Sequence, residues 1–273
     1  MKVIKYCLAA VLGIFMLMII GFNIWGWLTL GTVVPVEGAQ RDPDANRVVM
    51  VLGATGSAGD GLLKAAMADP DVERIHVLTR RSSPRLDAGV ASGRVSMRIH
   101  PDFTDYSGLE DILAEVDTVL WGLGTSSLNV DDATYTLIHV DFPMAFLRAW
   151  TAARNEGPRS FHFITGMGTD PESDTHWARE KGRTEREMAA LAEGTSLRTF
   201  SYRSAYIRPT SERANAFSYL GEWLFRPGGL AQPAIDLGRA MLEISARTQE
   251  LSNGTLVDAV DSIRYGEVYP HRD

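Results

Sequence analysis

Three glycines near residue 53 are spaced in a way that suits the phosphates of a dinucleotide. Gly53, Gly56 and Gly59 form G-x-x-G-x-x-G in the segment GATGSAG, directly after the apolar run 47–52 and before a helical pattern. Glycines let a pyrophosphate approach bare backbone, and a helix amino terminus offers free N–H groups and a favourable dipole. The spacing predicts a nucleotide-binding loop rather than a plain tight turn, with contacts from Gly53, Thr55, Gly56, Ser57, Ala58 and Gly59.

Two arginines stand at the end of the next apolar segment. The sequence there is Thr79-Arg80-Arg81, with no carboxylate at the turn. In dinucleotide-binding folds an acid at this place holds the ribose 2′-hydroxyl, whereas arginines accommodate a 2′-phosphate. The pair predicts NADP rather than NAD as the cofactor. The alternative is a solvated pair at a strand end.

The elements that must position these residues alternate between strands and helices. Strand-like runs occupy 47–52, 75–81, 95–103, 118–125 and 161–168, and helical spacing is plain in 135–155 and 177–193. Strand and helix in alternation predict a parallel sheet covered on both faces. We expect a three-layer α/β Rossmann fold over 47–273, with a small substrate-side cap in its carboxy-terminal third.

Several segments together resemble one superfamily. GATGSAG, PDFTD at 101–105, GLGT at 122–125 and the helix carrying Lys181 are similar to the extended and atypical short-chain dehydrogenase/reductases. The likeness covers roughly 47–209 and extends weakly to 246. It is strongest to their NAD(P)H-binding branch, which includes Tat-interacting-protein-like and NmrA-like members.

This resemblance implies roles for particular residues. Asp102 and Phe103 would border the adenine, and Gly122, Gly124 and Thr125 would lie beneath the nicotinamide-side ribose. Two further residues match the catalytic positions of the reductases: Thr165 at the end of the fifth strand, and Lys181, which also grips the ribose.

The tyrosine that donates a proton in these reductases is missing from its place. Trp177 stands four residues before Lys181, and an indole N–H is no acid at neutral pH. One hypothesis is an NADP-dependent oxidoreductase with another donor, for which the candidates are His176, Tyr202 and Tyr206. The others are a non-catalytic NADPH-binding sensor or scaffold and a vestigial nucleotide site, so the sequence leaves catalysis and substrate open.

The amino terminus predicts a membrane helix. Residues 7–30 carry no charge, and as a helix they would span roughly 36 Å, enough for a hydrocarbon core of roughly 30 Å. We expect a single-pass anchor in 1–35, held in a lipid bilayer through 7–30, and a linker in 36–46. A cleaved signal peptide or a re-entrant segment is the alternative. The flanking charges are nearly balanced, and the need for a nicotinamide cofactor favours a domain that faces the cytoplasm.

Composition excludes other classes. The net charge is −7 and no run of Lys or Arg exceeds a pair, so we expect no nucleic-acid partner. The single cysteine, Cys7, lies within the apolar segment, which rules out an intramolecular disulfide and a cysteine-based zinc site. No residues are spaced as metal ligands, so we expect no metal.

Overall fold

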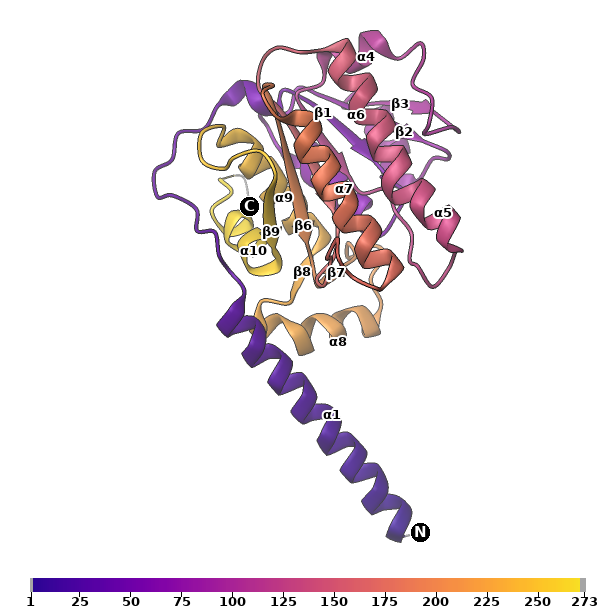
Figure 1. Ribbon diagram of the computed structural model, residues 1–273, viewed down its shortest axis with the longest axis vertical. Helices are drawn as coiled ribbons and strands as arrows, with labels where there is room; N and C mark the ends of the chain where they lie inside the picture. The colour runs from indigo at the N-terminus through magenta and orange to yellow at the C-terminus, as the bar shows by residue number, and fades with distance from the viewer. Residues whose placement is uncertain (1, 271–273) are drawn as a thin grey trace.

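A seven-stranded parallel sheet forms the centre of the protein within residues 2–270, the part of the chain described by this computed structural model (Figure 1). Its strand order, β3-β2-β1-β4-β5-β6-β9, reverses between β1 and β4, as the Rossmann prediction requires. Tyr206–Arg208 (β7) and Ala231–Pro233 (β8) make a separate small parallel pair. The strands of the main sheet are β1 Val48–Leu52, β2 Arg74–Thr79, β3 Val95–Ile99, β4 Thr118–Trp121, β5 Arg159–Ile164, β6 Leu197–Arg203 and β9 Thr255–Asp258.

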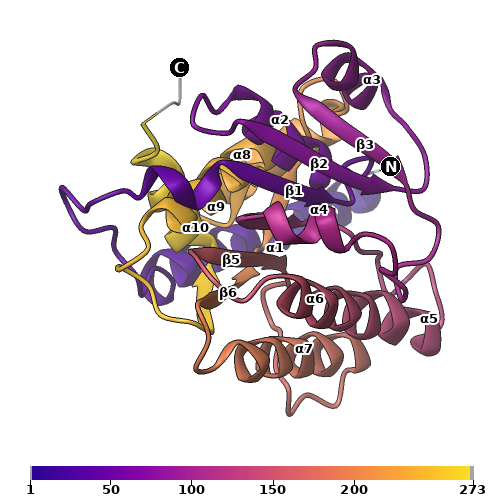
Figure 2. The same ribbon diagram turned by 90° about the horizontal axis from the view of Figure 1, so that it is seen from above.

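Helices cover both faces of this sheet (Figure 2). On one face lie α2 Gly59–Ala68, α9 Ala234–Ala246 and α10 Ala259–Glu267. The other face is covered by α4 Glu110–Glu115, α6 Phe142–Ala153 and α7 His176–Ala192. The remaining helical segments are α1 Lys2–Thr29, η1 Pro43–Asn46, α3 Pro84–Ala91, α5 Asp132–Thr136, the π-helix η2 Leu137–Asp141, α8 Ala216–Phe225 and η3 Arg226–Gly228.

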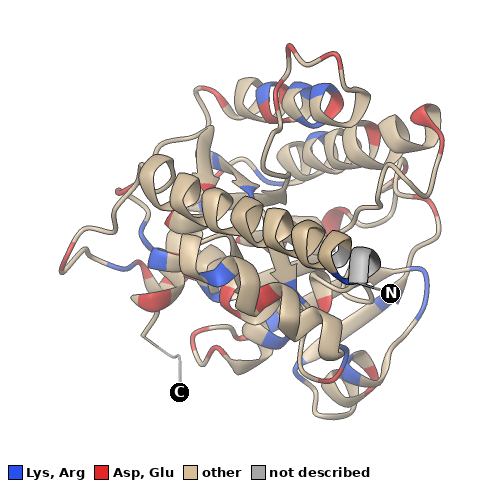
Figure 3. Ribbon diagram, turned by 90° about the horizontal axis from the view of Figure 1, so that it is seen from below, with Lys and Arg blue, Asp and Glu red and all other residues tan. Residues whose placement is uncertain are grey.

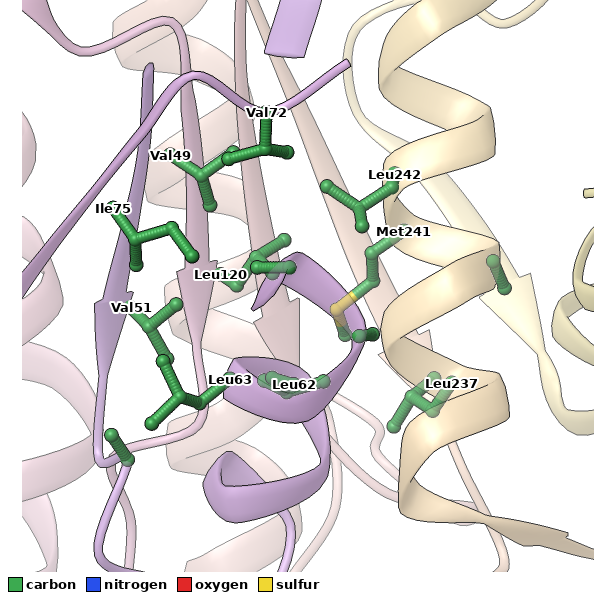
Figure 4. Packing of buried hydrophobic residues seen from close by; sticks show 14 of the residues in the cluster. Val49, Val51, Leu62, Leu63, Val72, Ile75, Leu120, Leu237, Met241 and Leu242 are labelled. Atoms are coloured by element: carbon green, nitrogen blue, oxygen red, sulfur yellow. The ribbon is translucent and has the colours of Figure 1, made fainter. Parts of the chain in front are cut away.

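The first strand shows why a parallel sheet forms here. Side chains alternate along a strand, and in β1 both sets are fully buried from Val49 to Leu52. Val49 and Val51 pack with α2 and α9, whereas Met50 and Leu52 belong to the hydrophobic cluster on the opposite face (Figure 4). An apolar run buried on both sides is typical of a central parallel strand.

Several strands end earlier than the apolar pattern predicted. The runs 95–103, 118–125 and 161–168 extend past the ends of β3, β4 and β5 by four residues each. The ladder pairing stops at these ends, and the chain turns into loops along the carboxyl edge of the sheet. Apolar residues in such loops line a cavity instead of continuing a strand, so their hydropathy alone misled the prediction.

Helix α1 extends away from the domain as a long, almost uncharged rod, in contrast to the mixed charges on the domain surface (Figure 3). Among the described residues it is a helix long and apolar enough to cross a bilayer, over Lys5–Thr29. Its carboxy-terminal end contacts the domain. The Asn23 side chain donates to the carbonyl oxygen of Leu224 at 2.9 Å and accepts from the amide of Gly228 at 2.6 Å.

The segment predicted as a linker lies along the domain surface. Before it, the amide of Val33 donates to Asp261 at 2.8 Å. Within it, the amide of Val36 donates to Glu250 at 3.0 Å, and the guanidinium of Arg41 donates to Glu243 at 3.0 Å. The connection between α1 and β1 is therefore fastened to the carboxy-terminal third of the chain.

Candidate functional site

The glycine-rich loop joins the end of β1 to the amino terminus of α2. Gly53 has a φ of +77°, a backbone conformation that favours glycine. A Cβ on Gly59 would lie 2.1 Å from the carbonyl oxygen of Gly53, so a side chain there would force loop and helix apart. The loop is as tight as a pyrophosphate-binding turn requires.

A cavity of about 470 Å³ opens over this loop, at the carboxyl ends of β1, β2 and β4. Open α/β sheets bind ligands at this edge, where the strand order reverses. Leu78, Thr79 and Leu123 form part of its wall. The predicted site residues in the wall are Gly53, Thr55, Gly56, Arg80, Arg81, Phe103, Gly122 and Gly124.

The two arginines of the second strand end are exposed side chains on the wall of this cavity. Among residues 2–270, no carboxylate forms an ion pair with either guanidinium. The Thr79 hydroxyl bonds the backbone of Arg81, donating to its carbonyl oxygen at 2.7 Å, and so fixes the turn that carries the pair. Both guanidinium groups are free to bind an anionic ligand.

The other predicted nucleotide contacts lie outside the cavity wall. Ser57 and Ala58 belong to the glycine-rich loop, just before α2. Asp102 is exposed and accepts hydrogen bonds from the amide and hydroxyl of Thr104, at 2.9 and 2.6 Å. Its neighbour Phe103 is buried and faces the cavity. Of the two predicted adenine neighbours, Phe103 therefore lines the cavity, whereas Asp102 lies beside it in sequence and outside the wall.

Thr125 is held by a histidine to which the sequence patterns assigned no role. His139 Nε2 lies 3.2 Å from the amide and 2.9 Å from the carbonyl oxygen of Thr125. Burial, and then the positive charge of Lys181, lower the pKa of His139 to about 4. The imidazole is therefore neutral at physiological pH and positions the loop after β4.

Thr165 and Lys181, the two predicted catalytic residues, lie in contact with each other. Lys181 Nζ donates to the backbone carbonyl oxygen of Thr165 at 3.0 Å. The Thr165 hydroxyl donates to Glu185 Oε1 at 2.9 Å, and Arg203 binds the other oxygen of Glu185 at 2.7 Å. Because the Thr165 hydroxyl already donates its one hydrogen to Glu185, it can only accept a further hydrogen bond.

Lys181 has an altered acidity. Burial lowers the pKa of its ammonium group to about 8, and the nearby charge of Glu185 opposes this shift. A lysine that loses its proton near neutral pH can exchange protons with neighbouring groups.

Trp177, at the place of the missing tyrosine, lies over the loop after β5, where a Cβ on Gly166 would be 3.7 Å from the indole ring.

The three proposed proton donors have different surroundings. Tyr202 is fully buried in the core, and its hydroxyl lies 2.8 Å from His162 Nδ1, so it does not face the cavities described here. His176 Nε2 contacts the Thr136 hydroxyl at 3.2 Å and the carbonyl oxygen of Asp132 at 3.1 Å. Of the three, Tyr206 borders a cavity that also contains Thr165.

This second cavity has a volume of about 360 Å³ and opens beside the ends of β5 and β6. Phe22 of α1 contributes to it, so the amino-terminal helix and the candidate catalytic residues share one cavity. Its wall consists of Phe22, Thr165, Gly166, Met167, Ser204, Ala205, Tyr206, Phe225 and Leu230. Sequence patterns could not show this, because Phe22 is indistinguishable from other apolar residues of the helix.

One polar cluster near the phosphate loop carries no sequence signal. Asp60, in the first turn of α2, is only 2% exposed and binds Arg85 through both carboxylate oxygens, at 2.9 and 3.1 Å. The Thr210 hydroxyl donates to it at 2.6 Å, and Arg213 donates to the carbonyl oxygen of Thr55 at 2.9 Å. The segment after β7 therefore reaches back to the glycine-rich loop. These partners are too distant in sequence to form a recognisable motif.

Comparisons with known proteins agree with this architecture. No family model matches the chain. Protein fmp52, mitochondrial, of Emericella nidulans is 26% identical over 147 residues, which cover 52% of this chain and 60% of that protein. Protein FMP52, mitochondrial, of Saccharomyces cerevisiae is 26% identical over 144 residues, covering 52% and 59%. The chain thus spans about three-fifths of the length of these curated relatives.

Solved structures match over a larger part of the chain. A 3-oxoacyl-[acyl-carrier protein] reductase from Brucella melitensis in complex with NAD has a TM-score of 0.58 and 17% identity, covering 82% of this chain and 98% of that one. A protein from Agrobacterium tumefaciens, described as a 2-deoxy-d-gluconate 3-dehydrogenase with bound NADP, has a TM-score of 0.56 and 15% identity, covering 80% and 96%. The chain has the short-chain dehydrogenase/reductase fold. At these identities the likeness concerns the fold alone.

Proposed function

We propose that this protein binds NADP(H) in the cavity over the glycine-rich loop. The observation that carries the proposal is the pair of exposed guanidinium groups, Arg80 and Arg81, on the wall that also contains Gly53 and Gly56. A guanidinium fork suits a 2′-phosphate, and no carboxylate of the described residues occupies it. NAD is the less suitable ligand, because its uncharged ribose 2′-hydroxyl would not neutralise the guanidinium groups of Arg80 and Arg81.

The residues present fit a dinucleotide. The glycine-rich loop leaves room for a pyrophosphate at the start of α2, Phe103 offers an apolar surface for the adenine, and Gly122 and Gly124 leave the ribose side unobstructed. When bound, the cofactor supplies or accepts a hydride. The neighbouring solved structures hold NAD in one case and NADP in another, as their descriptions state.

We further propose that the protein is an oxidoreductase acting in the cavity beside Thr165. Tyr206 brings a phenol hydroxyl to this cavity, and that hydroxyl now donates to the carbonyl oxygen of Ser218 at 3.2 Å. A phenol that exchanges this weak bond for a substrate oxygen can donate the proton that a reduction needs. Thr165 lines this cavity, and Lys181, which donates to the carbonyl oxygen of Thr165, would position the backbone of the loop after β5.

A non-catalytic NADPH-binding sensor is the second candidate. The observations in its favour are the indole of Trp177 at the tyrosine place and the Thr165 hydroxyl hydrogen bonded to Glu185. In that case Arg80 and Arg81 would hold the nucleotide without turnover. The relatives do not separate the candidates, since their names state a mitochondrial location and no activity.

We also propose that α1 anchors the protein in a membrane, with the domain on the side where nicotinamide cofactors are available. We propose that the helix stays part of the mature protein, because Asn23 fastens it to the domain. The helix also packs closely there, since a Cβ on Gly26 would lie 2.6 Å from the carbonyl oxygen of Gly228. A signal peptide needs no such fitted contact with the protein it leaves. Extraction of membranes at alkaline pH should leave the full chain in the pellet, and a soluble, shortened chain would support cleavage instead.

The nucleotide proposal is tested by calorimetry on the full chain in detergent, with NADPH and NADH. We expect Arg80→Ala and Arg81→Ala each to weaken NADPH binding about tenfold or more, since a hydrogen bond to a charged group contributes about 1.5–3 kcal/mol. NADH affinity should stay unchanged, and Arg148→Ala, an exposed arginine on α6, serves as the control. Equal effects on both nucleotides would contradict NADP preference, and no binding of either would overturn the proposal.

Turnover is tested separately. NADPH oxidation with a panel of aldehydes and ketones should be lost in Tyr206→Phe while the nucleotide affinity remains. Nucleotide binding without turnover of any carbonyl compound would favour the sensor.

A further inference from the structure

The wall of the cavity beside Thr165 combines apolar and polar side chains from different elements. Phe22, Phe225 and Leu230 come from the α1 and α8 side, whereas Thr165, Ser204 and Tyr206 come from the ends of the strands. A site of this kind holds the apolar part of a ligand and orients one polar group. Its volume of about 360 Å³ suits a small molecule rather than a peptide.

Ser204 supplies an unused hydrogen-bonding group in this wall. The residue is 6% exposed, and its hydroxyl is buried with no hydrogen-bond partner within residues 2–270. A buried hydroxyl without a partner costs about 1–3 kcal/mol, so a ligand oxygen here would recover that energy. Because the Thr165 hydrogen points to Glu185, Ser204 is the better placed donor to an uncharged oxygen acceptor.

Helix α8 presents an uncharged face beside α1. Phe217 is 82% and Trp223 is 68% exposed, and Tyr219 and Leu220 are also exposed. The charged residue of α8, Glu222, is buried and turned inward, where Arg208 binds its carboxylate. Exposed aromatic residues on such a helix are typical of a surface that rests in the membrane interface.

The two helices are held in one arrangement. Figure 1 shows α8 lying across the domain end of α1, and Phe22 and Phe225 meet edge to face with ring centroids 6.3 Å apart. The two hydrogen bonds of Asn23 fasten α1 to Leu224 and Gly228. A bilayer that holds α1 therefore also receives the outer face of α8, and the cavity opens at that level.

We propose that the cavity takes an uncharged carbonyl compound with an apolar chain, which enters from the bilayer between α1 and α8, with Ser204 donating to the carbonyl oxygen. This substrate class rests on the proposed oxidoreductase function and membrane anchor. Reduction places the hydride of NADPH on the carbonyl carbon and a proton on its oxygen, so the products are an alcohol and NADP⁺. A charged or short water-soluble carbonyl compound would gain little from the apolar wall.

Photo-crosslinking tests the site without requiring turnover. The probe is a 2-dodecanone analogue with a diazirine at the chain end, added to the full chain in phosphatidylcholine nanodiscs and mapped by mass spectrometry. We expect labels at residues 22, 167 and 225–230, which excess 2-dodecanone removes and acetone does not. Labels confined to residues 9–18 of α1, or labels insensitive to 2-dodecanone, would overturn the proposal.

Variants sharpen this experiment. Ser204→Ala should weaken competition by 2-dodecanone about fivefold, the effect of one lost hydrogen bond of about 1 kcal/mol. Phe22→Trp should obstruct the cavity and reduce labelling, whereas Phe15→Trp, on the exposed surface of the same helix, should not. Equal effects of the two Phe variants would contradict an entrance beside Phe22.

The same preparation separates this inference from the proposed function. Competed labels in the cavity without NADPH oxidation would leave the binding site standing and remove the oxidoreductase. Turnover of carbonyl compounds without labels in the cavity would support the oxidoreductase and overturn the proposed binding site. Turnover that is equally fast with acetone and 2-dodecanone would also contradict the substrate class.

Discussion

The Thr165 hydroxyl donates to Glu185 at 2.9 Å, and this contact turns its hydrogen away from the cavity that Thr165 borders. Glu185 comes from α7, twenty residues further along the chain, and is held in turn by Arg203 of β6. A residue that matches a catalytic position by its place in the sequence thus takes part in an ion-pair network.

This network should contribute to stability. We expect Glu185→Leu to lower the free energy of unfolding by about 2–3 kcal/mol, because it leaves the half-buried Arg203 charge unpaired. Glu187→Leu, which removes an exposed pair with Arg183 on the same helix, should cost less than about 1 kcal/mol. Denaturant titration of the full chain in detergent measures both. Equal losses in the two variants would contradict a special role for the buried pair.

The contact between Gly59 and Gly53 should be essential to the nucleotide site. Gly59→Ala would place a Cβ 2.1 Å from the carbonyl oxygen of Gly53, so the loop must move away from α2. We expect NADPH binding to fall below detection in calorimetry. Gly13→Ala is the control, because its Cβ would meet no atom within 4 Å. Retained NADPH affinity in Gly59→Ala would show that the loop does not hold the phosphates as we propose.

Lys181 should make stability depend on pH in the alkaline range. Its pKa is about 8 in the folded protein and near 10.5 without the fold, so between these values the unfolded chain binds more protons. The contribution of Lys181 to stability must therefore rise as the pH increases from 8 to 10. We expect Lys181→Met to be more stable than the parent at pH 7, with an advantage that shrinks towards pH 10. A pH-independent difference in denaturant titrations would show that Lys181 does not titrate in this range.

Asn23 should couple the amino-terminal helix to the domain. Asn23→Leu removes the two hydrogen bonds to the domain, with Leu224 and Gly228, each contributing about 1 kcal/mol, together with one to Ile19 within α1. We expect faster hydrogen exchange over residues 224–228 in the full chain. Thr29→Val is the matched control, since the Thr29 hydroxyl bonds only the carbonyl oxygen of Trp25 within α1. Unchanged exchange in Asn23→Leu would mean that α1 and the domain are not rigidly connected.

Local patterns predicted the fold and one part of the site. A buried strand, a glycine-rich loop and a helix are consecutive in the sequence, so the spacing of residue types was enough to place Gly53, Gly56 and Gly59 at a strand-to-helix turn. The resemblance to the short-chain dehydrogenases supplied Phe103 and Gly122, and Arg80 stands at the end of the second strand. The structure places all three on the wall of one cavity, because parallel strands bring their carboxyl ends to one edge. The fold and the placement of these residues could be predicted because each depends on neighbours in sequence or on the topology of the sheet, whereas nucleotide binding by these residues stays a prediction.

The partners of polar side chains were decided only by the tertiary structure. Asn23 bonds residues about two hundred positions away, and Thr210 bonds Asp60 across 150 positions. Hydropathy identified α1 as apolar but could not show that Phe22 belongs to the same cavity as Tyr206. A hydrogen bond depends on angles and distances of a few tenths of an ångström, which the packing of whole helices sets and the spacing of residue types does not encode.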